Sequence, residues 1–325
     1  MRPRTGISSF AGALSRYSRE LCVAAVLLLL LSALAVLAPS FYQAQPLLSL
    51  AAREAPTLLV ACGMALLLVS RQIDISVGSQ FAVCSVTTGL LLAAKWPLLL
   101  AAGAGVGLGA ALGGFNGLLV AGLRLPAIVV TLAGMVGWRE GLRWARQGLW
   151  VDLPDGVQWL GLRQAAGQCA VIGLALLLFV ALAWASRHLA AGRFLFAVGA
   201  NSEAARLAGI SPRLTTFAAF VLMGALTGLA AVMNVVQSPQ VDPNCGTGLE
   251  LKAIAAAVVG GIAVSGGRGR LWGVLAGLLL LACVSPALTH FRVEPHWERA
   301  IYGAIILVAV AAEGLRGRKQ TANFR

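Results

Sequence analysis

The sequence predicts an all-α integral membrane protein, a polytopic bundle of about ten transmembrane helices. Hydrophobic residues make up 59% of the 325 residues and charged residues only 11%, whereas soluble domains carry about a quarter charged residues. A water-soluble fold of this composition would expose large apolar patches. The apolar residues also fall into long runs, and such runs span a membrane as helices that satisfy their own backbone. We therefore expect one transmembrane domain over residues 1–325.

Ten apolar runs are candidate spans, because about 20 apolar residues cross roughly 30 Å of hydrocarbon. In chain order they are 21–38, 55–70, 77–94, 97–122, 126–138, 167–186, 214–236, 251–265, 271–288 and 299–315. The first run follows an arginine-rich start, but it is longer than the core of a signal peptide, about 7–15 residues, and Pro39 follows it directly. It therefore predicts an uncleaved first span.

The distribution of lysine and arginine predicts the orientation, because cytoplasmic loops are enriched in both. With the N-terminus inside, 16 of the 25 basic residues fall in cytoplasmic segments. These segments include a basic N-terminus at 1–20, a loop at 187–213 and a basic tail at 316–325. Both termini are then cytoplasmic. Because the basic residues follow the span ends, the positive charge indicates membrane lipids as surroundings and not a nucleic-acid partner.

One external segment departs from this charge pattern. Arg139, Arg143 and Arg146 follow the fifth span at helical spacing and so share one helix face. Two interpretations remain open. The segment is either an interfacial helix whose arginines snorkel beside tryptophans at the headgroups, or a docking surface for an acidic partner.

Glycine patterns predict close helix packing. Gly105, Gly109, Gly113 and Gly117 recur every four residues in the fourth span, and small residues at this spacing let helix backbones approach closely in a membrane. Two further pairs repeat the device, Gly224 with Gly228 and Gly273 with Gly277. The glycines between 260 and 269 predict an interrupted helix.

Few polar residues lie within or beside the spans, and such positions are candidates for a solute path. The candidates are Asp74, Ser76, Ser79, Asn116, Thr131, Thr247 and Glu250. Structural interpretations stand beside this one. Asp74 and the two serines suit a cap of the third helix, Asn116 suits a brace to a neighbouring helix, and Thr131 suits a bond to its own backbone. Glu250 in a first helical turn is favoured by the helix dipole.

No catalytic set, metal site or cofactor motif emerges from the sequence. The three histidines are scattered, the six cysteines show no C-x-x-C spacing, and SGGRGR lacks the spacing of a phosphate-binding loop. By contrast, 192–212 is a polar, helix-competent segment between long apolar runs. In a chain without a nucleotide-binding motif, such a segment predicts a membrane subunit that receives force from a separate motor protein.

Four segments resemble, in order, the permease subunits of bacterial sugar ABC importers. They are RQIDISVGS, GGFNGLLVAGLRLPAIVVTLAGM, FAVGANSEAARLAGI and TGLELKAIAAAVVGGIAVSGGRG. This is the ribose, xylose and rhamnose branch of a superfamily that also holds branched-chain amino acid permeases. SRQIDISVGS, LWVDLP and GTGLELKAIAA are similar to the autoinducer-2 import permeases in particular. The resemblance covers most of the chain and implies the fold of a type II ABC importer.

The resemblance also implies partners and a site. It indicates a transport subunit, not an enzyme, that pairs with itself or with a sister permease. Two cytoplasmic ATP-binding subunits and a periplasmic solute-binding protein would complete the importer. The segment GANSEAARLAGI matches the coupling helix that docks on the ATPase, and the matching residues are Gly199, Asn201, Glu203, Ala204, Ala205, Arg206 and Gly209. The chain departs from many relatives at Arg71 and Gln72, where those have a glycine pair.

The implied cargo is a monosaccharide or a solute like autoinducer-2, selected mainly by the binding protein. Three alternatives remain open. The first is a permease for branched-chain amino acids or another small solute on the same scaffold. The second is a secondary transporter or channel that works alone, although no row of intramembrane carboxylates supports proton coupling. The third and weakest is a membrane-embedded enzyme.

Overall fold

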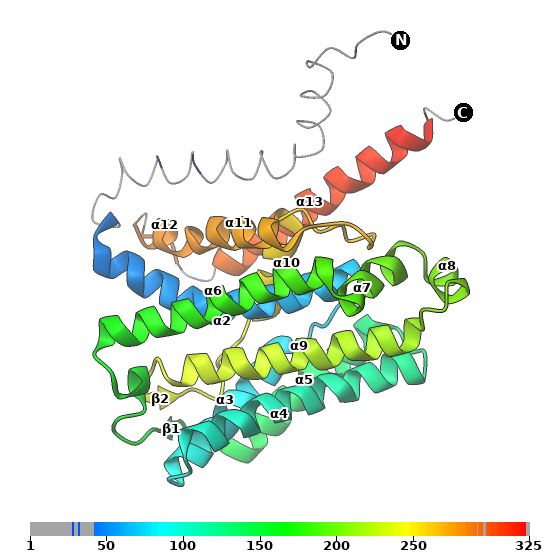
Figure 1. The fold of residues 1–325 in the computed structure, drawn as a ribbon. Helices are drawn as coiled ribbons and strands as arrows, with labels where there is room; N and C mark the ends of the chain where they lie inside the picture. Colours follow the sequence, from blue (N-terminus) through cyan, green and yellow to red (C-terminus); the bar gives the residue numbers. More distant parts are fainter. Residues whose placement is uncertain (1–27, 29–31, 33–41, 291, 295–296, 323–325) are drawn as a thin grey trace.

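The structure, a computed structural model, describes residues 28, 32, 42–290, 292–294 and 297–322. The predicted first span at 21–38 and the basic segment at 1–20 lie outside the described residues, apart from residues 28 and 32. The described part is a helix bundle (Figure 1), which confirms the predicted fold class. Its helices are α2 (Ala44–Val69), α3 (Val77–Ala93), α4 (Leu98–Gly117), α5 (Ala127–Arg146), α6 (Gln164–His188), α7 (Ala190–Ala200), α8 (Ser202–Leu207), α9 (Pro212–Val235), α10 (Leu249–Val259), α11 (Leu271–Ala282), α12 (Val284–His290) and α13 (Trp297–Ala322).

Short elements complete the description. A π-helical turn, η2 (Leu118–Gly122), continues α4, and a 3-10 turn, η3 (Gln158–Gly161), precedes α6. Two-residue strands β1 (Val151–Asp152) and β2 (Gln240–Val241) pair antiparallel. This pairing joins the connection between α5 and α6 to the connection between α9 and α10.

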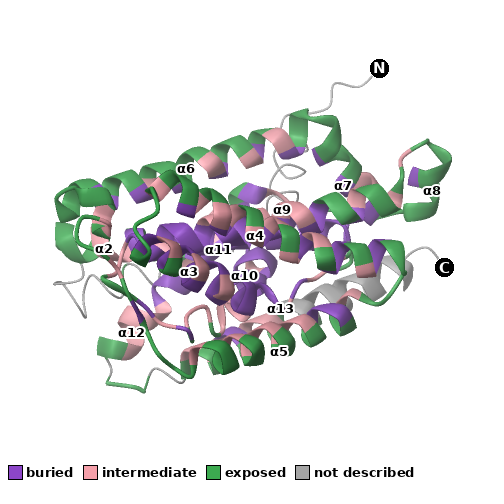
Figure 2. Cartoon of the chain, turned by 90° about the horizontal axis from the view of Figure 1, so that it is seen from below, coloured by how far each residue is buried: buried purple, intermediate pink, exposed green. Residues whose placement is uncertain are grey.

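Helix α2 is the centre of the bundle. Its residues from Glu54 to Val69 are all buried, and it packs against α6, α9, α10 and α11. Figure 2 shows the buried residues gathered on α2, α10 and α11, with largely exposed residues along α5 and α6. Because lipid tails solvate apolar side chains, exposed leucines and valines on such outer helices suit a membrane protein.

Five of the described helical segments are long and apolar enough to cross a membrane: α2, α4 with η2, α6, α9, and α11 with α12. The predicted second span at 55–70 is longer than expected, since α2 already begins at Ala44. The predicted fifth span at 126–138 continues as α5 to Arg146. The predicted eighth span at 251–265 breaks after Val259, and the 11 residues of α10 reach only about 16 Å.

The glycine stripe of α4 packs against α9. A Cβ atom added at Gly109 would lie 2.9 Å from the Cα atom of Gly228, and one added at Gly113 would lie 2.9 Å from the Cα atom of Gly224. Real Cβ atoms do not approach so closely, so glycine is required on both sides. Gly277 likewise approaches α10, where an added Cβ would lie 2.9 Å from the Gly260 nitrogen. These contacts confirm the predicted close packing.

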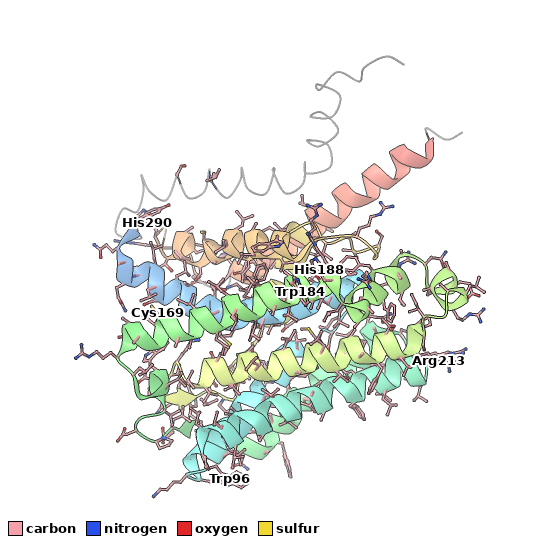
Figure 3. All side chains as sticks on the ribbon, viewed as in Figure 1. Trp96, Cys169, Trp184, His188, Arg213 and His290 are labelled. Atoms are coloured by element: carbon pink, nitrogen blue, oxygen red, sulfur yellow. The ribbon has the colours of Figure 1, made fainter. Side chains whose placement is uncertain are left out.

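The two ends of the bundle differ. The short helix α8 projects from one end, where Arg213 also lies, while Trp96 and Cys169 lie toward the other end (Figure 3). The predicted polar loop at 187–213 is therefore two helices with distinct surroundings. Helix α7 packs on the bundle and buries Leu195 and Val198, whereas α8 is mostly exposed.

Candidate functional site

Helix α8 is a short, well-defined helix at the tip of the bundle. Asn201 caps it, because its side-chain Oδ1 accepts hydrogen bonds from the backbone N–H groups of Glu203 and Ala204, each at 3.0 Å. This is the favoured chemistry at a helix start, where backbone donors lack helical partners. After α8, Gly209 adopts a left-handed φ of +82°, which glycine tolerates without strain.

Charged and apolar groups share the surface of α8. Arg206 Nη2 donates to Glu203 Oε1 at 2.5 Å, and both side chains are exposed. The hydrogen bond from the Arg206 guanidinium to Glu203 raises the pKa of Arg206 above its usual value. Leu207 beside it is 78% exposed. An exposed leucine next to a charge pair at the tip of a projecting helix is typical of a protein-docking surface.

The predicted coupling residues divide by burial. Asn201, Glu203, Ala204, Arg206 and Gly209 are exposed. Gly199 and Ala205 are buried and face the bundle. The structure therefore places the seven residues together at the projecting helix, with Gly199 and Ala205 buried against the bundle and the other five exposed.

The segment that precedes α8 is tightly joined to the core. We call this contact the joint, and it comprises residues 69–71, 199–200 and 265–267. Arg71 Nε donates to the Ser265 carbonyl at 2.7 Å, and Arg71 Nη2 donates to the Ala200 carbonyl at 3.0 Å. The Gly267 N–H donates to the Val69 carbonyl at 2.8 Å. A Cβ added at Gly199 would lie 2.9 Å from the Gly267 nitrogen. The end of α2, the end of α7 and the loop before α11 thus meet directly below α8.

Sequence reasoning missed the role of Arg71. The family resemblance implies only that Arg71 and Gln72 stand where many relatives have a glycine pair, and the contact partners lie 129 and 194 residues away. Arg71 keeps a glycine-like backbone, with φ of 61°. Glycine adopts this left-handed φ readily, which agrees with the glycine pair that the resemblance implies at this position.

A closed polar cluster lies between α3 and α4. Asp74 Oδ1 accepts hydrogen bonds from the backbone N–H of Ser76 at 2.9 Å and from the Ser76 hydroxyl. Gln80 Nε2 donates to Asp74 Oδ2 at 3.0 Å, and Asn116 Nδ2 donates to Ser76 Oγ at 3.0 Å. The expected brace from Asn116 to a neighbouring helix is confirmed. All four side chains are fully buried.

The expected cap of the third helix is only partly right. Asp74 bonds one backbone N–H, that of Ser76, at the start of α3. The serine hydroxyls do not cap; that of Ser79, for example, donates to the Ser76 carbonyl at 2.8 Å. The reason is that the Ser76 hydroxyl donates to the Asp74 carboxylate, while Ser79 lies within α3, where its hydroxyl bonds a backbone carbonyl.

The other three path candidates lie apart from this cluster. Thr131 Oγ1 donates to the Ala127 carbonyl of its own helix at 2.9 Å, as the structural interpretation expected. Thr247 is exposed and Glu250 is half-buried. The carboxylate of Glu250 lies beside Gly78. The structure thus divides the candidates among a buried cluster, α5 and the start of α10.

The three arginines predicted to share one face have separate surroundings. Arg139 is half-buried and donates to the carbonyls of Cys245 and Gly78, each at 3.0 Å. Arg143 is exposed and pairs with Glu140 at 2.7 Å, and Arg146 donates to the carbonyls of Leu149 and Trp150. Arg139 therefore joins α5 to α3 and to the loop before α10. Arg143 is left as the most accessible docking candidate.

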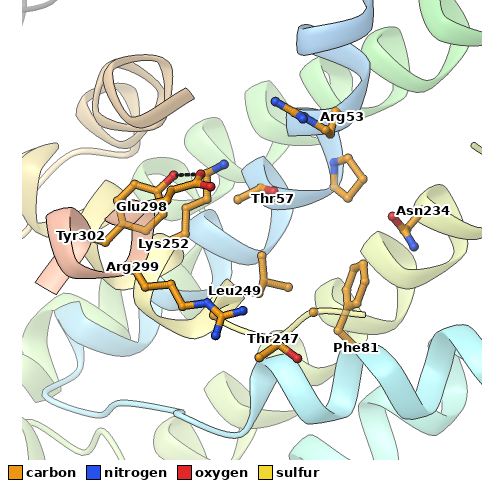
Figure 4. Close-up of a pocket in the computed structure, with 13 residues that line it drawn as sticks. Arg53, Thr57, Phe81, Asn234, Thr247, Leu249, Lys252, Glu298, Arg299 and Tyr302 are labelled. Carbon is orange, nitrogen blue, oxygen red and sulfur yellow. Dashed lines mark hydrogen bonds between the residues drawn. The ribbon is translucent and has the colours of Figure 1, made fainter. Parts of the chain in front are cut away.

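The structure also contains a cavity of about 490 Å³ that no sequence pattern indicated (Figure 4). Its walls come from α2, α3, α9, α10, α13 and the loop before α10. The lining residues are Arg53, Pro56, Thr57, Phe81, Asn234, Gly246, Thr247, Gly248, Leu249, Lys252, Glu298, Arg299 and Tyr302. Of the predicted path residues, Thr247 alone is among them. No sequence signal marks the cavity, because Arg53 and Arg299 lie at the ends of apolar runs, where basic residues are common.

Comparison with known proteins gives a consistent result. The family model described as "Branched-chain amino acid transport system / permease component" matches residues 47–310. The chain is 35% identical over 299 residues to the autoinducer 2 import system permease protein LsrC of Enterobacter sp. (strain 638), covering 91% of this chain and 87% of that protein. It is 36% identical over 300 residues to LsrC of Klebsiella pneumoniae, with the same coverage. It is 36% identical over 260 residues to LsrC of Escherichia coli (strain K12 / DH10B), covering 79% and 75%. No solved structure matches the chain.

Proposed function

The chain belongs to the family of permease components of branched-chain amino acid transport systems, and from that premise we propose which solute it carries and how it is driven. It is a multi-pass membrane permease, as its relatives and its apolar helices indicate. We propose that its solute is a monosaccharide or a molecule like autoinducer 2. The proposal rests on relatives named as autoinducer 2 import permeases that cover nine-tenths of the chain.

The proposed driving mechanism is ATP hydrolysis by a separate cytoplasmic subunit. The observation that carries it is the geometry of α8: a capped helix, exposed along its charged and apolar face, whose base is joined to α2 and to the loop before α11. A partner that pushes α8 would move these segments together, because the joint links them through backbone atoms. The bundle would then shift between outward and inward access.

The proposed assembly has three further parts. Two ATP-binding subunits would grip α8 in each of two permeases, and the second permease would be another copy or a sister chain. A periplasmic binding protein would deliver solute to the opposite end. In this arrangement α8 and both termini are cytoplasmic, and the Asp74 cluster together with Thr131, Thr247 and Glu250 stays a predicted path.

A permease for branched-chain amino acids is the second candidate, favoured by the description of the matching family. A transporter that works alone is the candidate of a different class. The two are separated by different observations. A ligand screen of the binding protein encoded beside this chain distinguishes sugars from amino acids, and uptake driven by a proton or sodium gradient would favour the transporter that works alone.

The experiment that tests the proposal alters α8 in the assembled importer. Glu203→Lys reverses the charge beside Arg206, and Gly209→Trp places a large side chain at a left-handed backbone position. Both variants are expected to reach the membrane and to lose solute uptake while ATP hydrolysis continues. Glu203→Asp keeps the negative charge and serves as the matched control. Normal uptake in both altered variants would contradict a coupling role for α8.

A further inference from the structure

The 490 Å³ cavity is built at a definite place in the bundle. Its lining includes the first half of α2, the last turn of α9 and the first turns of α10 and α13. It lies away from α8, which connects α7 to the start of α9. A cavity of this volume is in the range of small-molecule sites, about 300–1,000 Å³.

The positive groups of the cavity are not equally engaged. Lys252 donates to Glu54 at 2.7 Å and lies 5.8 Å from the centre of the Tyr302 ring, so its charge has a partner. Arg53 and Arg299 make no hydrogen bond or ion pair with any other residue in the part of the chain that the structure describes. Arg299 lies against the loop before α10, where a Cβ added at Gly248 would be 3.2 Å from its Nε.

The other polar groups leave the cavity rich in donors. Glu298 is its one lining carboxylate, and it accepts a hydrogen bond from the Tyr302 hydroxyl. Thr57 and Asn234 make no side-chain hydrogen bond with another described residue. The cavity lining therefore has two guanidinium groups but one carboxylate, and that carboxylate already accepts a hydrogen bond (Figure 4). Phe81 and Leu249 add apolar wall.

Arg53 and Arg299 are both exposed, so their guanidinium groups are accessible to a solute that enters the cavity. Guanidinium groups bind planar or paired oxygen acceptors well, because their N–H donors form a rigid fork. We propose that this cavity is a binding site for a small, oxygen-rich solute, held through hydroxyl or anionic oxygens by Arg53 and Arg299. On the proposed function, it is the site that the solute meets after it leaves the binding protein.

The test uses a thiol introduced in the cavity wall of the full chain, in membranes and without partner proteins. Thr57→Cys is made in a background with the native cysteines replaced by alanine. The thiol is labelled with anionic sulfonatoethyl methanethiosulfonate and with its cationic trimethylammonium counterpart. Each rate is divided by the rate with a free thiol. We expect the anionic reagent to be favoured about tenfold, because clefts lined by one sign of charge concentrate the opposite sign.

The expected preference depends on the two arginines. Arg53→Gln with Arg299→Gln should bring the ratio of rates close to one, whereas Arg163→Gln, outside the cavity, should leave it unchanged. A thiol that reacts with neither reagent, or a ratio that the double variant does not alter, overturns the proposal. Gel filtration of each variant shows whether the bundle is intact.

A protection experiment tests the class of solute. D-ribose, L-rhamnose, ribose 5-phosphate and inorganic phosphate are each added at millimolar concentration before labelling, with L-leucine as the oxygen-poor control. At least one oxygen-rich compound should slow labelling twofold or more, and only while both arginines are present. Protection by sugars alone indicates hydroxyl recognition, and protection by phosphates indicates anion recognition. Protection by none, or by L-leucine equally, overturns the assignment. Because no ATPase is present, this result is independent of whether α8 couples transport to ATP hydrolysis.

Discussion

Arg71 shows at the level of one residue how a side chain can compensate for an unfavourable backbone. Its φ of 61° lies in the left-handed region, which costs a non-glycine residue roughly 1–2 kcal/mol. Its two bonds to the Ser265 and Ala200 carbonyls offset that cost, because bonds from charged donors are worth about 1.5–3 kcal/mol each when shielded from water. Arg71 is exposed, which reduces this benefit.

The first prediction is an order of stability at position 71. Arg71→Ala keeps the strained backbone and loses both bonds, so we expect it to be less stable by about 1–2 kcal/mol. Arg71→Gly loses the bonds but relieves the strain, so it should fall between the two. Thermal unfolding of the purified protein in detergent measures the order. Arg213→Ala, at an exposed arginine, is the control, and an alanine variant as stable as the glycine variant would contradict the account.

The sequence can predict that a buried polar side chain needs a hydrogen-bond partner, but it cannot predict which residue that partner is. A buried Asn116 had to find a hydrogen-bond partner on another helix, and it bonds Ser76. The sequence did not show that Ser76 would accept this hydrogen bond, because the two positions are 40 residues apart. Arg139 shows the same limit. Its spacing placed it with Arg143 on one face, but the loop before α10 folds close enough to engage it.

Helices α4 and α9 are held together by backbone approach. The Gly109 and Gly224 backbones are in direct contact, so dispersion contacts between backbones replace side-chain interdigitation. The sequence predicted close packing at this helix face but not the partner helix, because a period of four residues places small residues on one face whatever the partner is.

The second prediction adds one methyl group to this contact. Gly109→Ala places a Cβ against the backbone of Gly224 and Gly228, and we expect a loss of about 1–3 kcal/mol from overpacking. Gly107→Ala is the matched control on the same helix, since nothing lies within 4 Å of its added Cβ. Apparent melting temperature in detergent gives the comparison. Equal stability of the two variants would contradict a tight backbone contact between α4 and α9 at Gly109.

Element boundaries were the least predictable feature. Apolar composition continues past the break after Val259, because Ile262, Ala263 and Val264 follow the two glycines and extend the run. The fifth span was predicted to end at residue 138, with the arginines in a separate helical segment, yet α5 continues through them to Arg146. Hydropathy marks where a chain is buried in lipid, whereas helix ends depend on caps and on contacts from distant segments.

At the scale of the whole molecule, the end opposite α8 would receive the binding protein. The third prediction concerns Arg143, which is exposed there, and Arg146, which is half-buried and bonds carbonyls just after α5. Arg143→Glu with Arg146→Glu should reduce stimulation of ATP hydrolysis by the binding protein and weaken its dependence on salt, because rim charges steer association. Arg139→Glu should instead destabilise the bundle, since Arg139 bonds two backbone segments. An unchanged ATPase response in the double variant would remove the docking role.

The division of labour in the proposed importer stays a prediction. Its basis in the sequence is a chain of long apolar runs with one polar, helix-competent segment and no nucleotide-binding motif. The cavity and the joint were not predictable, because both are assembled from residues that are far apart in sequence and ordinary in type. Their functional meaning depends on the tertiary structure alone.

The most direct measurement of the central claim is solute accumulation in liposomes. The purified chain, alone, should bring the solute of its binding protein to equilibrium at most and never concentrate it, with or without an ion gradient. Addition of the ATP-binding subunits, any sister permease, the binding protein and ATP should produce uphill accumulation. Robust uphill accumulation by the chain alone would contradict the account.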